Sequence, residues 1–281
     1  FAMSVSTIPL SVPTPLRARF RRNFRVSHLV VILLVAFAVI VPLVSPDNAM
    51  VVNPARRFSP PFGATLFGTD NLGRDLGVLV AAGLRTSLLI ALLVVTIAGV
   101  LGWLLGAISA YAGGWIDDVL GRVMDAFNAF PGIILAIALT TAIGPSFSTL
   151  IAVLVGVTWV NYARVVRARV LSLKNEEYII ASRLYGAKQR FVLLRHIWPN
   201  TVDLVISVAL AQIANVMLAE STITFLGFGL QPPNVSLGLI ITQTKDYLQI
   251  NGYPVMFAGI VLVAACTSVA MSVFSFRGGQ K

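Results

Sequence analysis

Hydrophobic positions along this chain gather into six long runs, and polar stretches separate one run from the next. Each run is long enough, with some tilt, to cross a hydrocarbon core of about 30 Å. Backbone groups inside lipid must find hydrogen-bond partners within their own segment, so runs of this length are expected to be helices. The six predicted transmembrane helices cover residues 28–44, 84–110, 119–143, 147–170, 202–227 and 254–276.

The composition is typical of an integral membrane protein. Of its 281 residues, 57% are hydrophobic and 11% are charged, and the mean hydropathy is +0.86. An ordinary soluble domain is about 25% charged. We therefore predict an all-α, polytopic membrane protein whose main surroundings are the lipid bilayer.

The distribution of charge predicts the topology. The formal net charge of +10 would suggest a nucleic-acid partner in a soluble chain, but here the cations cluster beside apolar runs, so we expect no nucleic acid. The N-terminal arm 1–27 and the loop 171–200 are the most basic stretches, which predicts that both are cytoplasmic. Six spans then make 45–83 an external loop, leave 84–276 as a five-helix core, and return the tail 277–281 to the cytoplasm.

The polar segment 176–200 contains two short amphipathic patterns on either side of Gly186. Gly186 supplies a left-handed residue that lets two helices meet at an angle, and Pro199 suits the first turn of the next helix. We expect a rigid elbow whose apolar face fits a partner groove; a plain solvated loop is the alternative. Its apolar positions are Tyr178, Ile179, Leu184, Tyr185, Phe191 and Leu194, and its cations are Arg183, Lys188, Arg190 and Arg195.

Polar residues inside the spans should face protein or water, because an ionised side chain near the membrane centre costs about 3 kcal/mol. The candidates for a water-filled substrate pathway are Asn128, Gln212 and Asn215. Asp125 is expected to pair with Arg122 one turn away, and Glu220 to cap a helix near its outer end. Gly102 and Gly106 form a small-residue stripe, which we interpret as close packing within the bundle.

Motifs for chemistry are sparse. The chain has no Gly-x-Ser-x-Gly elbow and no Gly-Lys-Ser/Thr phosphate loop. His28 and His196 have no second ligand at metal-binding spacing, and Cys266, the only cysteine, is expected to be a small buried hydrophobe. We therefore predict no enzymatic activity, no metal and no cofactor in this chain. An ATP-independent channel or ion-coupled carrier is an alternative, in which Asp125 and Glu220 would form the relay.

Several blocks give the chain a resemblance to a known family. Ala181, Ser182, Gly186 and Pro199 are spaced as in the coupling loop of binding-protein-dependent ABC importer permeases. Ile180 stands where that pattern has Glu, and Trp198 where it has Leu. Blocks at 67–75, 111–131 and 225–233 resemble, in order, those of the C-type subunit of dipeptide and oligopeptide permeases. In the first block, Asp70 can cap a turn and Arg74 can pair with Asp70 or Asp75.

The resemblance implies a six-helix permease with the type I ABC importer fold, in the cytoplasmic membrane of a prokaryote. It implies a homologous permease as partner, two cytosolic subunits that bind ATP and Mg, and an external peptide-binding protein. The cargo it implies is dipeptides or oligopeptides, with nickel or another small solute as the alternative. The residues implied to contact the ATPases are Glu177, Tyr178, Ala181, Ser182, Arg183, Tyr185, Gly186, Arg190 and Pro199.

Overall fold

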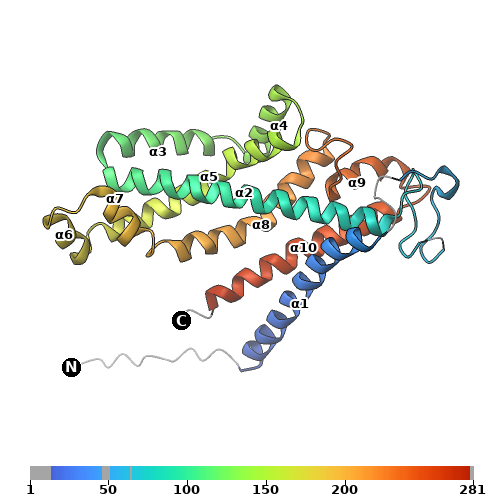
Figure 1. The fold of residues 1–281 in the computed structure, drawn as a ribbon, viewed down its shortest axis with the longest axis horizontal. Coiled ribbons are helices and arrows are strands. Elements are labelled where there is room, and N and C mark those ends of the chain that lie inside the picture. The colour runs from blue at the N-terminus through green and yellow to red at the C-terminus, as the bar shows by residue number, and fades with distance from the viewer. Residues whose placement is uncertain (1–13, 46–50, 64, 279–281) are drawn as a thin grey trace, which may run out of the picture.

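The computed structural model describes residues 14–45, 51–63 and 65–278, and it is an elongated bundle of helices (Figure 1). Its helices are α1 Thr14–Val44, α2 Leu76–Ala112, α3 Gly114–Asn128, α4 Gly132–Ile143, α5 Phe147–Leu173, α6 Glu177–Leu184, α7 Gln189–Val192, α8 Val202–Phe225, α9 Leu237–Thr244 and α10 Tyr253–Gly278. Short turns are η1 Pro54–Arg56, the π-helical η2 Leu193–Ile197 and η3 Lys245–Tyr247. The prediction of an all-α membrane fold is confirmed.

The centre of the bundle is the contact of α2 with α5, which run side by side over most of their lengths. Gly102 and Gly106 lie in this contact. A Cβ atom at Gly102 would lie 2.5 Å from the Tyr162 Cβ, and one at Gly106 would lie 2.9 Å from the Ala163 Cα. The small-residue stripe is therefore a packing feature within this chain, as predicted.

The third predicted span, 119–143, is not one straight helix. It consists of α3 and α4, which are bent by 88° relative to each other. Pro131 explains the break, because the residue before a proline avoids the helical conformation and a proline cannot donate a backbone hydrogen bond. Within the described residues, five helices are long and apolar enough to span a membrane, and the count rises to six if the bent pair is one span.

Helix α2 begins at Leu76, so the predicted external loop 45–83 extends too far into the helix. The side chain of Asp75 accepts hydrogen bonds from the backbone nitrogens of Gly77 and Val78 and thereby caps the helix. Helix α1 likewise starts at Thr14, within the predicted arm 1–27. Residues 1–13 of that arm and 279–281 of the predicted tail lie outside the described residues.

At the end of the bundle opposite α6, the loop before α2 folds against α9 (Figure 1). Asp70 is fully buried there and pairs with Arg74 at 2.6 Å. Its Oδ1 also accepts hydrogen bonds from the backbone nitrogens of Leu72 and Arg74, and Arg74 donates to Oε1 of Gln243 at the end of α9. The expected capping by Asp70 is confirmed, and Arg74 pairs with Asp70 rather than Asp75.

Candidate functional site

The basic loop, residues 171–200, stands on a small hydrophobic core of its own. The buried side chains beneath it are Ile179 of α6, Val192 of α7 and Ile197 of η2, which pack with the adjoining ends of α2 and α5. Nε1 of Trp103 on α2 donates a hydrogen bond to Oγ1 of Thr201 at 2.9 Å, and its ring meets that of Trp198 edge-on with centroids 4.8 Å apart. These contacts fix the loop to the long central helix.

Gly186 ends α6 in the conformation that the sequence predicts. Its φ is +80°, and a Cβ atom there would meet no atom within 4 Å, so only the backbone requires glycine. The backbone nitrogen of Ala187 donates to the Ser182 carbonyl, and that of Gly186 donates to the Arg183 carbonyl. This pair of bonds is a Schellman motif, which fixes the angle between α6 and the chain that follows.

The outer surface around α6 carries exposed apolar side chains. Tyr185 is 92% exposed, Leu184 83% and Tyr178 44%. Ile179, which the sequence analysis grouped with them, is fully buried and belongs to the base of the loop instead. The other predicted contact residues lie on the surface as well: Glu177, Ala181, Arg183, Arg190 and Pro199 are exposed, and Ser182 is half-buried.

Pro199 does not lie in the first turn of the following helix, as the sequence analysis expected. Helix α8 begins at Val202, and Pro199 lies in the turn between η2 and α8. The backbone nitrogen of Trp198 makes the last π-type bond, to the Leu193 carbonyl. Because Pro199 has no N–H to continue that pattern, the turn ends there.

Two of the three predicted pathway residues lie together in a cavity. Nδ2 of Asn215 donates to Oε1 of Gln212 at 2.9 Å, and both line a cavity of about 270 Å³ between α4, α5 and α8. Thr158 and Asn161 of α5 line the same cavity. Asn128 is elsewhere: it is exposed at the end of α3, and its Nδ2 bonds back to the Met124 carbonyl at 2.9 Å.

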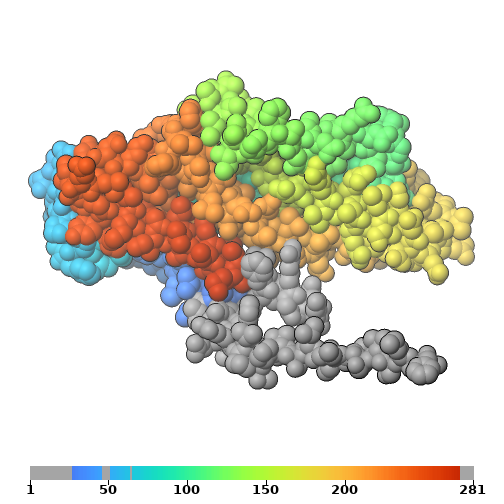
Figure 2. All heavy atoms as spheres, turned by 180° about the vertical axis from the view of Figure 1, so that it is seen from behind, coloured from blue at the N-terminus to red at the C-terminus, as the bar shows by residue number. Residues whose placement is uncertain are grey.

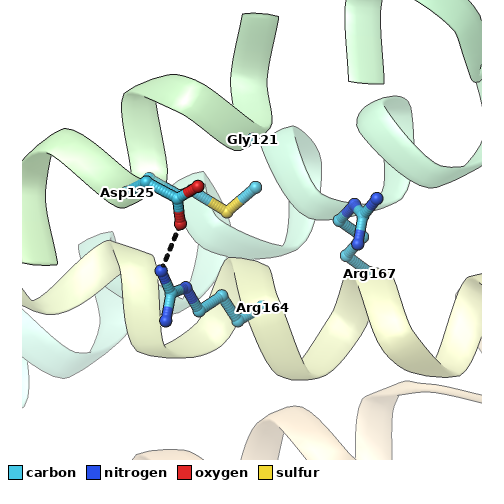
Figure 3. A pocket seen from close by; sticks show the side chains of 5 residues that line it. Gly121, Asp125, Arg164 and Arg167 are labelled. Atoms are coloured by element: carbon cyan, nitrogen blue, oxygen red, sulfur yellow. Dashed lines mark hydrogen bonds and ion pairs between the residues drawn. The ribbon is translucent and has the colours of Figure 1, made fainter. Parts of the chain in front are cut away.

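A second cavity, of about 300 Å³, lies between α3 and α5 and is charged. In it Asp125 points from α3 to Arg164 of α5, as Figure 3 shows, and accepts a hydrogen bond from its guanidinium at 2.7 Å. The expected pairing with Arg122 is therefore wrong, because Arg164 faces Asp125 across the cavity. The next basic residue, Arg167, bonds both carboxylate oxygens of Asp117 at 2.6 Å.

Glu220 is fully buried in α8 among hydroxyl groups. It accepts hydrogen bonds from Ser87 at 2.9 Å, from Thr224 at 3.0 Å and from Ser221 at 3.2 Å. It thus joins α8 to α2 instead of capping a helix end, which corrects the expectation. One of these donors comes from α2 and the other two from α8 itself, so the buried carboxyl group has its hydrogen-bond partners where the two helices pack.

The sequence analysis missed Asn161 as a polar residue facing the cavity and interpreted Arg164 only as a topology signal. The pattern was present, because Thr158, Asn161, Arg164 and Arg167 recur at intervals of three along α5. Neighbouring members of this series lie about 60° apart around the helix axis, so the series turns around α5 from one cavity toward the other. Hydropathy averaged over the span conceals it.

Long apolar helices with open cavities between them that carry polar side chains, and a basic loop at one end, are features of a membrane protein of the permease class. Residues 98–276 match the family described as binding-protein-dependent transport system inner membrane component. The chain therefore belongs to this family. Members are permease subunits that work in a transporter complex with other subunits.

Individual relatives extend the similarity over most of the chain. A Brucella suis protein, whose name assigns it to a peptide transport system as a permease, is 36% identical over 258 residues, which are 92% of this chain and 87% of that one. The dipeptide transport system permease protein DppC of Bacillus subtilis is 31% identical over 253 residues, covering 89% and 77%. DppC of Alkalihalophilus pseudofirmus is 32% identical over 229 residues, covering 82% and 75%.

Proposed function

We propose that this chain is one half of the membrane pathway of an ATP-driven importer of dipeptides or oligopeptides. The names of its relatives support peptides as the cargo. A homologous permease would supply the other half, an external binding protein would deliver the peptide, and two cytosolic subunits would bind ATP and Mg. The basic loop and both termini would face the cytoplasm of a prokaryotic cell, in keeping with the arginines of the loop.

The observation that carries the proposal is the combination of an exposed apolar tip with a buried base in the basic loop. Leu184 and Tyr185 are the most exposed large apolar residues of this region, while Ile179 beneath them is fully buried. An exposed apolar tip is a surface for a partner. The base connects it to α2 through Trp103 and Thr201, so a push on the tip would reach the centre of the bundle.

In this mechanism the ATPase subunits hold α6 and move it when they close on ATP. Because the Schellman motif at Gly186 fixes the direction of α6, the movement would be passed on to α5 and α8 rather than absorbed in the loop. The two permeases would then alternate between outward and inward access. This chain supplies the lever and half of the channel, and the hydrolysis of ATP takes place in the partners.

The test is the ATPase activity of the complex reconstituted with partner permease, ATPases and peptide-loaded binding protein. The variant Leu184→Ser/Tyr185→Ser should lower peptide-stimulated ATPase activity and uptake at least about tenfold, since burial of one such side chain contributes about 1.5–3 kcal/mol. The matched control is Leu248→Ser/Ile250→Ser, in which the residues are 52% and 72% exposed at the other end of the molecule. The coupling role fails if the two double variants behave alike.

A further inference from the structure

Polar side chains of α5 line both of the cavities described above, and together with the polar residues that face them we call them the polar track. Thr158 and Asn161 line the first cavity, and Arg164 and Arg167 line the second. Asn161 and Arg164 are three residues apart, about 4.5 Å along the helix and within one turn of each other. The break between α3 and α4 separates the helices that cover the two cavities, since α3 covers the charged one and α4 the amide-lined one.

The two parts of the track offer different chemistry. The amide part, with Asn161, Gln212 and Asn215, is neutral and presents both donors and acceptors. The charged part presents the guanidinium of Arg164 and the carboxylate of Asp125, which among the described residues bond to each other. Their side chains are 48% and 77% exposed in this chain, so nothing else in the described structure covers them. Both groups can therefore be reached from the cavity by a ligand.

Arg167 shows by contrast why Arg164 is the one available cation of this cavity. Arg167 makes a two-point ion pair with Asp117, which also accepts a hydrogen bond from Ser109. The Asp117 side chain is only 16% exposed. The half-buried two-point pair of Arg167 is geometrically complete, whereas Arg164 has a single bond to its partner in the described structure.

We propose that this track binds the transported peptide directly, with the amide part taking the peptide groups and with Arg164 and Asp125 taking the charged ends. A short peptide is a zwitterion whose ends carry a carboxylate and an ammonium group, with amides between. Each residue of an extended chain spans about 3.3–3.6 Å, so a di- or tripeptide reaches both parts of the track. A guanidinium can bind a carboxylate through two parallel hydrogen bonds. This inference rests on the peptide cargo proposed above.

The two cavities measure about 270 and 300 Å³, at the lower end of the range of about 300–1,000 Å³ for pockets that bind small ligands. The homologous permease would close the site from the other side. Because the contacts on this chain are to groups that every peptide shares, they would accept many side chains and select for peptides as a class.

Cysteine labelling in the assembled complex tests the contact, without nucleotide and without binding protein so that the permeases alone meet the peptide. In a Cys266→Ala background, Asn161→Cys is treated with a dipeptide that carries a bromoacetyl group on a lysine side chain. The thiolate displaces bromide and forms a thioether. Ala152→Cys is the matched control, because Ala152 is exposed on the same helix about two and a half turns from Asn161 and therefore faces the opposite side of α5.

Asn161→Cys should be labelled much faster than Ala152→Cys, and an unreactive dipeptide should protect it. The C-terminal amide of that dipeptide should need about tenfold higher concentration to protect, since it lacks the charge that Arg164 would bind. Arg164→Gln should abolish this difference, and Arg169→Gln, the same substitution at an exposed position of α5, should retain it. Equal labelling at both positions, absence of protection, or an unchanged difference in Arg164→Gln would overturn the proposal.

A second experiment distinguishes failure of the proposed peptide cargo from failure of the proposed binding track. If the native complex with its binding protein shows neither peptide uptake nor peptide-stimulated ATPase activity, the proposed function fails. If the native complex takes up peptide while the labelling shows no contact, only the binding track is refuted.

Discussion

Replacing Gly102 by alanine should destabilise the protein, although alanine is the better helix former. The added Cβ atom would lie 2.5 Å from the Tyr162 Cβ and 2.6 Å from the Trp159 carbonyl oxygen, whereas carbon atoms pack best at about 3.5–4.0 Å. The α2 and α5 backbones would therefore have to separate by about 1 Å. Overpacking of this kind costs about 1–3 kcal/mol, and improved helix propensity offsets about 1 kcal/mol.

The expected result is a net loss of up to about 2 kcal/mol, since the cost of overpacking exceeds the gain in helix propensity. It would be measured as a lower thermal unfolding temperature of the assembled transporter in detergent, followed by tryptophan fluorescence. Gly156→Ala is the control, since a Cβ at Gly156 of α5 meets no atom within 4 Å. That variant should be neutral or stabilised by up to about 1 kcal/mol. Equal stabilisation by both substitutions would refute the close contact of α2 with α5.

Two hydrogen bonds between helices make further predictions. Ser87→Ala should remove one hydrogen-bond donor from the buried carboxylate of Glu220 and lower the free energy of unfolding by about 1–3 kcal/mol, measured by thermal unfolding. Thr86→Ala should cost much less, because the Thr86 hydroxyl bonds to a carbonyl of its own helix. Equal losses in the two variants would contradict the role of the carboxylate. Trp103→Phe should remove the bond to Thr201 and cost about 1 kcal/mol, with reduced coupling of ATPase activity to uptake, and unchanged coupling would separate this bond from the lever.

Hydropathy, together with the Gly and Pro residues between apolar runs, predicted roughly where the long helices lie in the sequence. It did not predict where a helix bends or where it begins. The break at Pro131 was missed because an average over the span responds to apolar content, and the residues on both sides of the proline are apolar. The cap at Asp75 was missed for a related reason: the apolar run was taken to begin at Leu84, although helix α2 already starts at Leu76.

Contacts between distant residues were the least predictable part of the site. Asp125 was paired with Arg122 because neighbours on one helix are the only partners a single sequence places together, and the structure instead pairs it with a residue 39 positions along the chain. Local backbone conformations were easier to predict from the sequence. The left-handed conformation of Gly186 followed from the residue type and its place between two amphipathic patterns.

The length of α2 has a mechanical consequence. Its 37 residues make a rod of about 55 Å, nearly twice the thickness of the hydrocarbon core. One end carries the Asp75 cap beside the buried ion pair of the outer loop, and Trp103 joins the other half to the base of the basic loop. A stiff rod turns rotation into displacement. A tilt of about 5° about one end would move the other end by about 5 Å, which is roughly the rise of one helical turn. A small rotation of α2 at the basic loop would therefore displace its other end, on the far side of the membrane, by about one turn.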